Sequence, residues 1–393
     1  MKMLFRQPFV ICLTLLLTAL MSSTSHALVW APYKNVGPAH YITVILYNNT
    51  TGPAGANSAV MVSVNMNSLR SGTQSIYKSD LSNVNWQDGH GNILKSWLEY
   101  DGLKDSKPTY YWINLGPNTI PAGGRLTIYQ VVYATNMSAM DGVDTGAEPN
   151  YIPNSYGRYD NGAQVFTFYD NFAGTAINTA NWTTNISISG GAISVNNGLT
   201  LTSRGGTSAS EASINFVKAQ STSDIVIEAF MNYFGSIGTN VRARVNHGLA
   251  LSATPTVSDF GYFSGMDNFA TNTVYLAWVP NLLNSVAALP LPTSTTDYNT
   301  IDRQTMIANG GKFTWTPLNP VSYQPLATRS AAFTGSTFSQ GYAATNDANS
   351  FGSTTQLNIK LVRIRPFSSL PTPAESTVSS PTQIIYRGFL PRL

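Results

Sequence analysis

Residues 110–134 read YYWINLGPNTIPAGGRLTIYQVVYA, two β-branched and aromatic runs separated by Pro, Asn and Gly. We predict strands at residues 110–115 and 126–134, with a turn at 121–124 ahead of the second strand. Similar short apolar runs alternate with Gly, Asn, Pro and Ser clusters along the rest of the chain, and helical periodicity is scarce. The sequence therefore predicts an all-β protein built from sandwiches.

The remaining strands are predicted on the same grounds, with a tight turn at residues 88–92. They are residues 41–47, 60–64, 199–202, 224–233, 241–245, 274–279, 312–315 and 357–365. A stretch rich in Asp, Gly, Asn, Pro and Tyr interrupts them at residues 141–162, where we place the domain boundary. The predicted parts are a small β-sandwich (28–150), a linker (151–162), a larger jelly roll (163–370) and a Pro/Ser/Thr-rich tail (371–393).

Charged residues make up only 10% of the 393 residues, against about 25% in ordinary soluble domains, and the net charge is +3. The chain has no basic block of five or more residues, which argues against nucleic acid as a partner. A surface with few titratable groups suits an acidic exterior, because stability changes with pH only where groups titrate. An ordinary Asn- and Thr-rich secreted β protein explains the composition equally well.

Residues 1–27 have the three-part form of a secretory signal peptide. Lys2 and Arg6 supply the positive end, residues 9–21 are apolar, and small residues surround the expected cleavage after Ala27. The apolar run is shorter than the roughly 20 residues that span a bilayer, although an uncleaved N-terminal anchor is the alternative. Cleavage after Ala27 would leave a mature chain that is extracellular or at the cell surface and has no membrane span. The one cysteine, Cys12, lies in the apolar run and would be removed with it, so the mature chain is predicted to have no disulfide.

The first half resembles the domain of unknown function 2341, which occurs in exported archaeal and bacterial proteins. The resemblance lies in ITV at 42–44, SWLE at 96–99, YWI at 111–113, IPAGG at 120–124 and LTIY at 126–129. It implies an architecture and an exported protein, but it assigns no activity.

The second half resembles the concanavalin-like lectin and glucanase sandwiches. The resemblance starts with YGRYDNG at 156–162, YDNF at 169–172 and NW at 181–182, and ends with VRIRPF at 362–367 and LPTP at 370–373. It implies a jelly roll that follows the first domain in a cell-surface protein. Lectins, glycosidases and inert adhesion modules share this fold, so the fold leaves the function open.

Aromatic side chains in the second half are the predicted ligand-binding residues, because their faces stack on sugar rings. For each of them, packing in the core is the alternative interpretation. They are Trp182, Trp278, Trp315, Tyr262 and Tyr275. The leading hypothesis is a non-enzymatic protein that binds or adheres to glycans or to neighbouring surface proteins.

A glycosidase needs two carboxyl groups about 5–10 Å apart. Asp224 and Glu228 share a strand face, but their Cα atoms are expected roughly 13 Å apart, and Val226 stands where a central acid belongs. We therefore predict a core strand with polar ends. A hydrolase or lyase that uses dispersed acids, Glu211, Asp224, Glu228 or Asp259, is the alternative.

No metal cofactor is predicted. The histidines of the mature chain are far apart in sequence and lack His-x-x-x-His spacing: His40, His90 and His247. Two segments could offer oxygens to Ca²⁺, residues 88–92 and the Asp170-Asn171 pair, and the first is more simply a turn.

Three weaker signals remain. Sequons for glycosylation in a competent host occur at Asn48, Asn49, Asn136, Asn181 and Asn185. The local basic cluster of Lys360, Arg363 and Arg365 is predicted to be a solvated strand end. The apolar segment 383–390 could add a strand to another subunit's sheet, which makes a self-assembling structural subunit a further alternative.

Overall fold

A computed structural model defines the fold over most of the chain after residue 39. The residues that it describes are 40–48, 53–64, 76–100, 108–151, 154–186, 190–208, 210–218, 220–221, 224–236, 243–250, 260–267, 273–277, 285–290, 297–307, 312–320, 323–325, 329–332, 337–346, 354–366 and 384–389. The expected signal peptide lies outside them. Among these residues no helix is long and apolar enough to cross a membrane.

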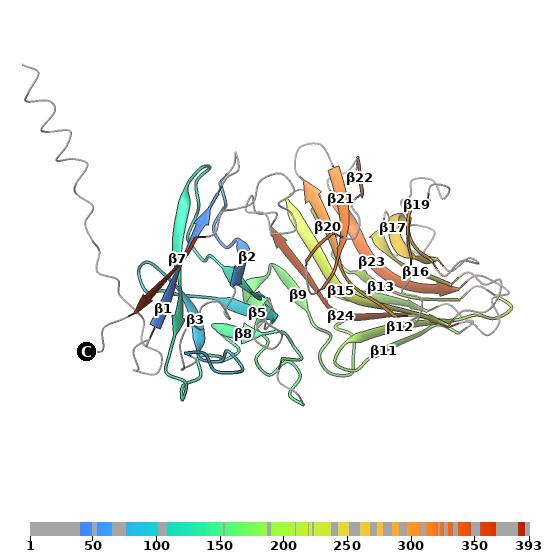
Figure 1. The fold of residues 1–393 in the computed structure, drawn as a ribbon. Coiled ribbons are helices and arrows are strands. Elements are labelled where there is room, and N and C mark those ends of the chain that lie inside the picture. The colour runs from blue at the N-terminus through green and yellow to red at the C-terminus, as the bar shows by residue number, and fades with distance from the viewer. Residues whose placement is uncertain are drawn as a thin grey trace, which may run out of the picture.

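Two sheets form a first sandwich, drawn in blue to green in Figure 1 apart from the dark red C-terminal strand. One sheet has the order β25 (Ile384–Phe389), β1 (His40–Tyr47), β7 (Arg125–Val132), β3 (Val84–Asp88) and β4 (Ile93–Leu94). The other has the order β2 (Ala59–Val64), β6 (Thr109–Asn114), β5 (Ser96–Tyr100) and β8 (Thr145–Ala147). The described pairings within them are antiparallel except for β5 with β8.

The first core forms because alternate residues of these strands point to one face. Ile42 and Val44 of β1 are fully buried, while the residues between them are partly exposed. They pack in one cluster with Trp86 of the same sheet and with Val62 and Tyr111 of the facing sheet. Contacts between both sheets make this unit a sandwich.

The second sandwich lies beside the first and is drawn in green to orange in Figure 1. Its larger sheet has the order β11 (Ala192–Val195), β12 (Leu199–Arg204), β24 (Thr354–Pro366), β15 (Ile225–Ser236), β20 (Asp297–Ile307), β21 (Lys312–Leu318) and β22 (Arg329–Ala332), with β9 (Phe168–Asp170) also on β24. The opposite sheet has the order β10 (Trp182–Ile186), β13 (Ser210–Phe216), β23 (Thr337–Asn346), β16 (Ala243–Ala250) and β17 (Phe260–Asp267), with β14 (Gln220–Ser221) on β23. A separate hairpin pairs β18 (Thr273–Ala277) with β19 (Ser285–Pro290).

The core of the second sandwich joins its two sheets. Leu201, Met231 and Ile359 from the larger sheet pack in one cluster with Trp182 and Tyr342 from the opposite sheet. Trp182 stacks on the ring of Phe216 with ring centroids 4.3 Å apart, and both rings belong to this core. The all-β fold class and its two sandwiches are therefore confirmed.

A short connector joins the sandwiches. It contains a single turn of helix, α2 (Gly162–Val165), followed by β9. Phe166 packs edge-on against Trp97 and Trp112 of the first sandwich. The same cluster includes Leu361 of the second sandwich, so the two units share a third core between them.

A β-bulge in β24 decides which of its residues face the first sandwich. Opposite β15, Phe230 pairs with Leu361 and Met231 pairs with Ile359, so Lys360 is the extra residue. Before the bulge Ile359 points into the second core, and after it the residue that does so is Val362. The shift turns the alternate residues after Lys360 toward the first sandwich.

The C-terminal strand returns to the first half of the chain. β25, the dark red strand beside β1 in Figure 1, pairs antiparallel with β1 from His40↔Phe389 to Ile45↔Ile384. The apolar tail was expected to add to a sheet edge of another subunit, and here it adds to the sheet edge of its own chain.

Each predicted strand overlaps an observed one, and the turn at 88–92 is also observed. Asp88 organises that turn, because its Oδ1 accepts the backbone N–H groups of His90 and Asn92, both at 2.9 Å. This is an Asx-type turn, the arrangement that Asp favours.

Candidate functional site

A row of polar side chains crosses the outer face of the larger sheet, the face opposite its core. Thr200, Asn358 and Asn232 are partners in register on three adjacent strands, β12, β24 and β15. Thr200 Oγ1 donates to Asn358 Oδ1 at 2.9 Å. Their chain neighbours, such as Leu201 and Ile359, point into the core, so alternation places this row outside.

The polar row lies in a cleft of about 650 Å³, which is within the range of small-molecule sites. The cleft extends from the sheet to the β11–β12 turn and to Asn150, which follows β8 of the first sandwich. Both halves of the chain therefore contribute to it. Its lining residues are Asn150, Ser194, Asn196, Asn197, Gly198, Leu199, Thr200, Phe230, Met231, Asn232, Thr300, Pro320, Asn358, Ile359 and Lys360.

Uncharged hydrogen-bonding groups dominate this lining, and five of the lining residues are asparagines. A carboxamide both donates and accepts hydrogen bonds. Phe230 and Pro320 add apolar surface beside the polar row. Lys360 is the one charged residue among the described lining, and it forms an ion pair with Glu148 of the first sandwich. The cleft therefore suits an uncharged ligand that is rich in hydroxyl groups.

The turn that borders the cleft has an unusual backbone. Asn197 has φ 53° and Gly198 has φ 134°, both in the region that favours Asn and Gly. Asn197 Oδ1 accepts the N–H of Gly174 at 3.2 Å, which anchors the turn. Asn and Gly are thus required by the turn as well as available to a ligand.

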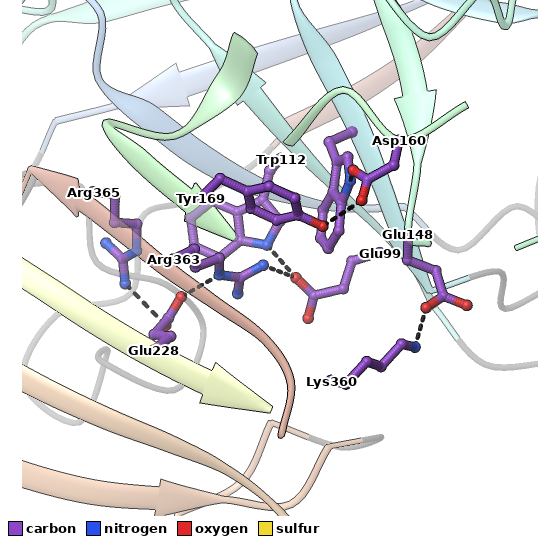
Figure 2. A network of polar contacts seen from close by, with 10 residues as sticks. Glu99, Trp112, Glu148, Asp160, Tyr169, Glu228, Lys360, Arg363 and Arg365 are labelled. Atoms are coloured by element: carbon purple, nitrogen blue, oxygen red, sulfur yellow. Dashed lines mark hydrogen bonds and ion pairs between the residues drawn. The ribbon is translucent and has the colours of Figure 1, made fainter. Parts of the chain in front are cut away.

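Beside the cleft, a buried ion network joins the two sandwiches (Figure 2). Arg363 of β24 donates from Nη1 to Glu99 of β5 at 2.5 Å and from Nε to Glu228 of β15 at 2.7 Å. Arg365 Nη2 lies 3.4 Å from Glu228. The side chains of these four residues are at most 4% exposed.

Aromatic rings enclose this network. The guanidinium of Arg363 lies over the Trp112 ring at 4.5 Å and near the Phe230 ring at 5.0 Å, distances typical of cation–π contacts. Trp112 also donates its indole N–H to Glu99 at 2.5 Å. Phe230 lines the cleft, so the network and the cleft share a side chain.

The two carboxylates of the network have opposite pKa shifts. Burial alone would raise the pKa of Glu228, but the charges of Arg363, Arg365 and Arg303 outweigh burial and lower the pKa to about 2. Burial raises the pKa of Glu99, and Arg363 offsets this only in part. The neighbouring cations therefore stabilise the ionised form of Glu228 more than that of Glu99.

The sequence predicted that the basic cluster of Lys360, Arg363 and Arg365 is a solvated strand end, and this prediction is wrong for both arginines. Arg363 and Arg365 are 0% and 1% exposed because the first sandwich covers this part of β24, while Lys360 at the bulge stays partly exposed. One feature of the sequence indicates that the strand changes faces here: Leu361 and Val362 are adjacent apolar residues in a segment that otherwise alternates between apolar and polar residues.

The aromatic residues predicted to bind a ligand fall into three groups. Trp182 and Trp315 are 1% and 5% exposed and donate their indole N–H groups to Asp170 and Asp302, at 2.8 and 2.9 Å. Burial leaves them no face for a sugar, so packing is their observed role. Trp278 lies outside the described residues. Tyr262 and Tyr275 belong to β17 and β18, of which the backbone is described.

The dispersed acids do not meet in the cleft. Glu211 accepts a hydrogen bond from Ser213 on β13, Asp224 is exposed before β15, and Glu228 is held in the buried ion network. Asp259 lies outside the described residues. Among the described lining residues none is a carboxylic acid, so the paired carboxyls of a glycosidase are not found there. The predicted core strand is observed as β15, and Asp224 precedes it, but Glu228 lies inside the strand and is buried, so it is not a polar strand end.

The oxygens proposed for Ca²⁺ already serve the fold. Asp88 accepts three hydrogen bonds within its turn. Asp170 accepts from the Phe172 backbone and from the indole of Trp182, and Asn171 donates to Asp160. These oxygens are therefore engaged in hydrogen bonds within the fold, and the described part of the chain holds no cluster of three or more His, Cys, Asp or Glu side chains suited to a metal ion.

Accessibility divides the sequons. Asn48 is buried and its Nδ2 donates to the carbonyl of Ile120 at 2.9 Å, so it is not an acceptor in the folded protein. Asn136 and Asn185 are exposed, and Asn181 is partly exposed. Asn49 lies outside the described residues. Glycosylation at the exposed positions stays a prediction.

Sequence reasoning did not find the cleft. Thr200, Asn232 and Asn358 are far apart in the sequence and follow no motif, and only strand register brings them together. The one available signal was the alternation of Asn with apolar residues, as in LNIK at 357–360.

Comparisons with known proteins leave the family open. No protein-family model and no curated protein matches the chain. The resemblance to the domain of unknown function 2341 therefore remains a prediction.

Solved structures similar to this chain include legume lectin-like domains. The carbohydrate recognition domain of Emp47p is 13% identical with TM-score 0.36, and the alignment covers 49% of this chain and 91% of that one. The legume lectin-like domain from Entamoeba histolytica is 12% identical with TM-score 0.32, covering 47% and 90%. Lectin II from Ulex europaeus is 11% identical with TM-score 0.35, covering 51% and 99%. Because these similarities are weak, the fold assignment rests on the strand pairing and the cores described above.

Proposed function

We propose that this protein is an exported, non-enzymatic carbohydrate-binding protein, and that the ligand binds in the cleft on the outer face of the larger sheet. The observation that carries the proposal is the row of Thr200, Asn358 and Asn232 at the wall of a 650 Å³ cleft. Export is inferred from the signal-like residues 1–27.

The chemistry of the cleft supports a sugar ligand. Sugar hydroxyls donate and accept hydrogen bonds, as do carboxamides, so each asparagine can satisfy a hydroxyl in either sense. The C–H face of a sugar ring is apolar and packs on aromatic or apolar side chains, for which Phe230 and Pro320 are placed in the lining. A near-neutral lining disfavours strongly charged ligands, which need several opposite charges.

The test is a glycan array with the folded protein, followed by calorimetry with the best ligand on two variants, Asn232→Ala and Asn358→Ala. We expect each to weaken binding by about tenfold, equivalent to about 1.4 kcal/mol. The matched control is Asn185→Ala, an exposed asparagine on the opposite sheet, which should bind like the parent.

Two results would overturn the proposal. One is the absence of any saturable glycan binding by folded protein across the array. The other is binding that both cleft variants retain at full affinity, since the ligand would then bind elsewhere.

A further inference from the structure

The C-terminal strand lies at the edge of its sheet. In the order β25-β1-β7-β3-β4, β25 has β1 as its described neighbour, and the two strands pair over six residue pairs. The chain reaches β25 from β24 of the second sandwich through residues 367–383. The strand therefore belongs to one sandwich by pairing and follows the other in sequence.

The core residues that the structure describes for the first sandwich come from a continuous part of the chain. The buried residues of that core include Ile42, Val62, Trp86 and Ile128, and they extend to Ala147. β1 also pairs with β7 on its other side along its whole length. β1 is therefore held by β7 on one side, and β25 pairs with its other side as the outermost strand.

We propose that β25 is exchanged between copies, so that Ile384–Phe389 of one molecule pairs with β1 of a second molecule. The inference is independent of the proposed glycan cleft. Its occupant is the same strand that fills the edge in the monomer, so the six pairs and their register are identical in both forms. Only the tether distinguishes the two forms.

The tether makes the choice between them a question of concentration. Residues 367–383 contain Pro371, Pro373 and Pro381 among Ser and Thr, a composition typical of extended linkers. A short linker supplies an effective concentration in the millimolar range, and a second copy at similar concentration competes on equal terms. Exchange of an identical element is a low-cost route to assembly.

The connectivity sets the kind of assembly. Exchange links the second sandwich of one molecule to the first sandwich of the next, which is a head-to-tail contact. Such contacts continue into open chains unless two molecules exchange strands reciprocally and close a dimer. Both products place β25 on the β1 of another copy.

Disulfide trapping tests the exchange. Thr43 and Tyr386 are partners in register, so a disulfide between them reports the pairing of β1 with β25. In a Cys12→Ser background, one chain carries Thr43→Cys and a second chain, tagged to a different length, carries Tyr386→Cys. The two are refolded together at about 1 mM and oxidised. We expect a mixed dimer on a non-reducing gel.

The control replaces the first partner with Val143→Cys, an exposed residue of the first sandwich outside β1. It should give little mixed dimer, because random collisions do not align with the strand register. A variant that lacks residues 374–380 should give more mixed dimer than the parent, because shortened hinges favour swapping.

A chain that carries both cysteines completes the test. Intramolecular disulfide without mixed dimer, at high concentration and with the shortened tether, overturns the proposal. Absence of both disulfides also overturns it, because the pairing of β1 with β25 would then not form in solution. A mixed dimer that exceeds the Val143→Cys control supports it.

Discussion

Arg363 Nη1 lies 2.5 Å from Glu99 Oε2, and this ion pair connects side chains 264 positions apart in sequence, in two different sandwiches. The same guanidinium donates to Glu228 within its own sandwich. Separating the sandwiches would break this ion pair and expose the apolar side chains packed around it, among them Trp97, Trp112 and Leu361. The two units are therefore expected to unfold together.

Replacing Arg363 by Met should destabilise the protein by about 3–5 kcal/mol, because Glu99 loses its cation and Glu228 loses its nearest one while both carboxylates stay buried. The matched control is Lys360→Met on the same strand, where the ion pair with Glu148 is partly exposed. It should cost less than about 1 kcal/mol. Urea unfolding followed by tryptophan fluorescence measures both. Equal losses for the two variants would contradict a special role for Arg363.

The two carboxylates should respond to pH in opposite ways. The pKa of Glu228 is lowered to about 2 in the folded state, so its stabilising effect is complete above the unfolded pKa of 4.5 and disappears as the pH falls toward 2. The loss caused by Glu228→Gln should therefore shrink as the pH is lowered over that range.

Glu99 provides the comparison. Its pKa is raised, so ionisation opposes folding and stability falls as the pH rises above 4.5. Glu99→Gln should improve relative to the parent as the pH rises. Denaturant midpoints of both variants at several pH values measure these trends, and the same trend in both would refute the assignment.

The stability of the protein should also depend on pH through Asp302. Burial raises its pKa to about 8, although Trp315 and Gln304 donate hydrogen bonds to it. For an acid with a raised pKa, stability is highest below the unfolded value and declines as the pH rises to the folded value. Asp302→Asn should therefore be more stable relative to the parent at pH 8 than at pH 5. A difference that is constant with pH would mean that Asp302 does not titrate in this range.

Gly146 of β8 tests how closely the connector packs on the first sandwich. A Cβ at this position would lie 2.2 Å from Asn161 Oδ1 and 2.4 Å from the carbonyl oxygen of Tyr159. The second atom belongs to the backbone, so Gly146→Ala should cost about 1–3 kcal/mol through overpacking. Gly55→Ala is the control, since nothing lies within 4 Å of its Cβ position, and thermal unfolding should separate the two variants.

The strands could be predicted from the sequence because their signal is local. In β1 and β7, β-branched and aromatic residues end at Gly, Pro or Asn, and these patterns do not depend on the rest of the chain. The same argument found the Asp88 turn, since Asp88 bonds to residues within four positions.

The site could not be predicted in this way, because its contacts are remote. Burial of Arg363 requires a bulge at Lys360 and a covering surface that contains Trp112, and neither follows from the local sequence. The tryptophans misled for a related reason. The ring face of Trp182 could stack on a sugar, but the ring packs on Phe216 in the interior and Asp170 accepts its N–H there.

The bulge at Lys360 has an evolutionary consequence. Inserting one residue into a regular strand ordinarily exchanges the two faces of everything that follows it. Here the bulge absorbs Lys360, so Val362 and Ile364 still point into the core and Arg363 and Arg365 still face the neighbouring sandwich. The strand can therefore gain or lose this one residue in evolution while it keeps both of its faces.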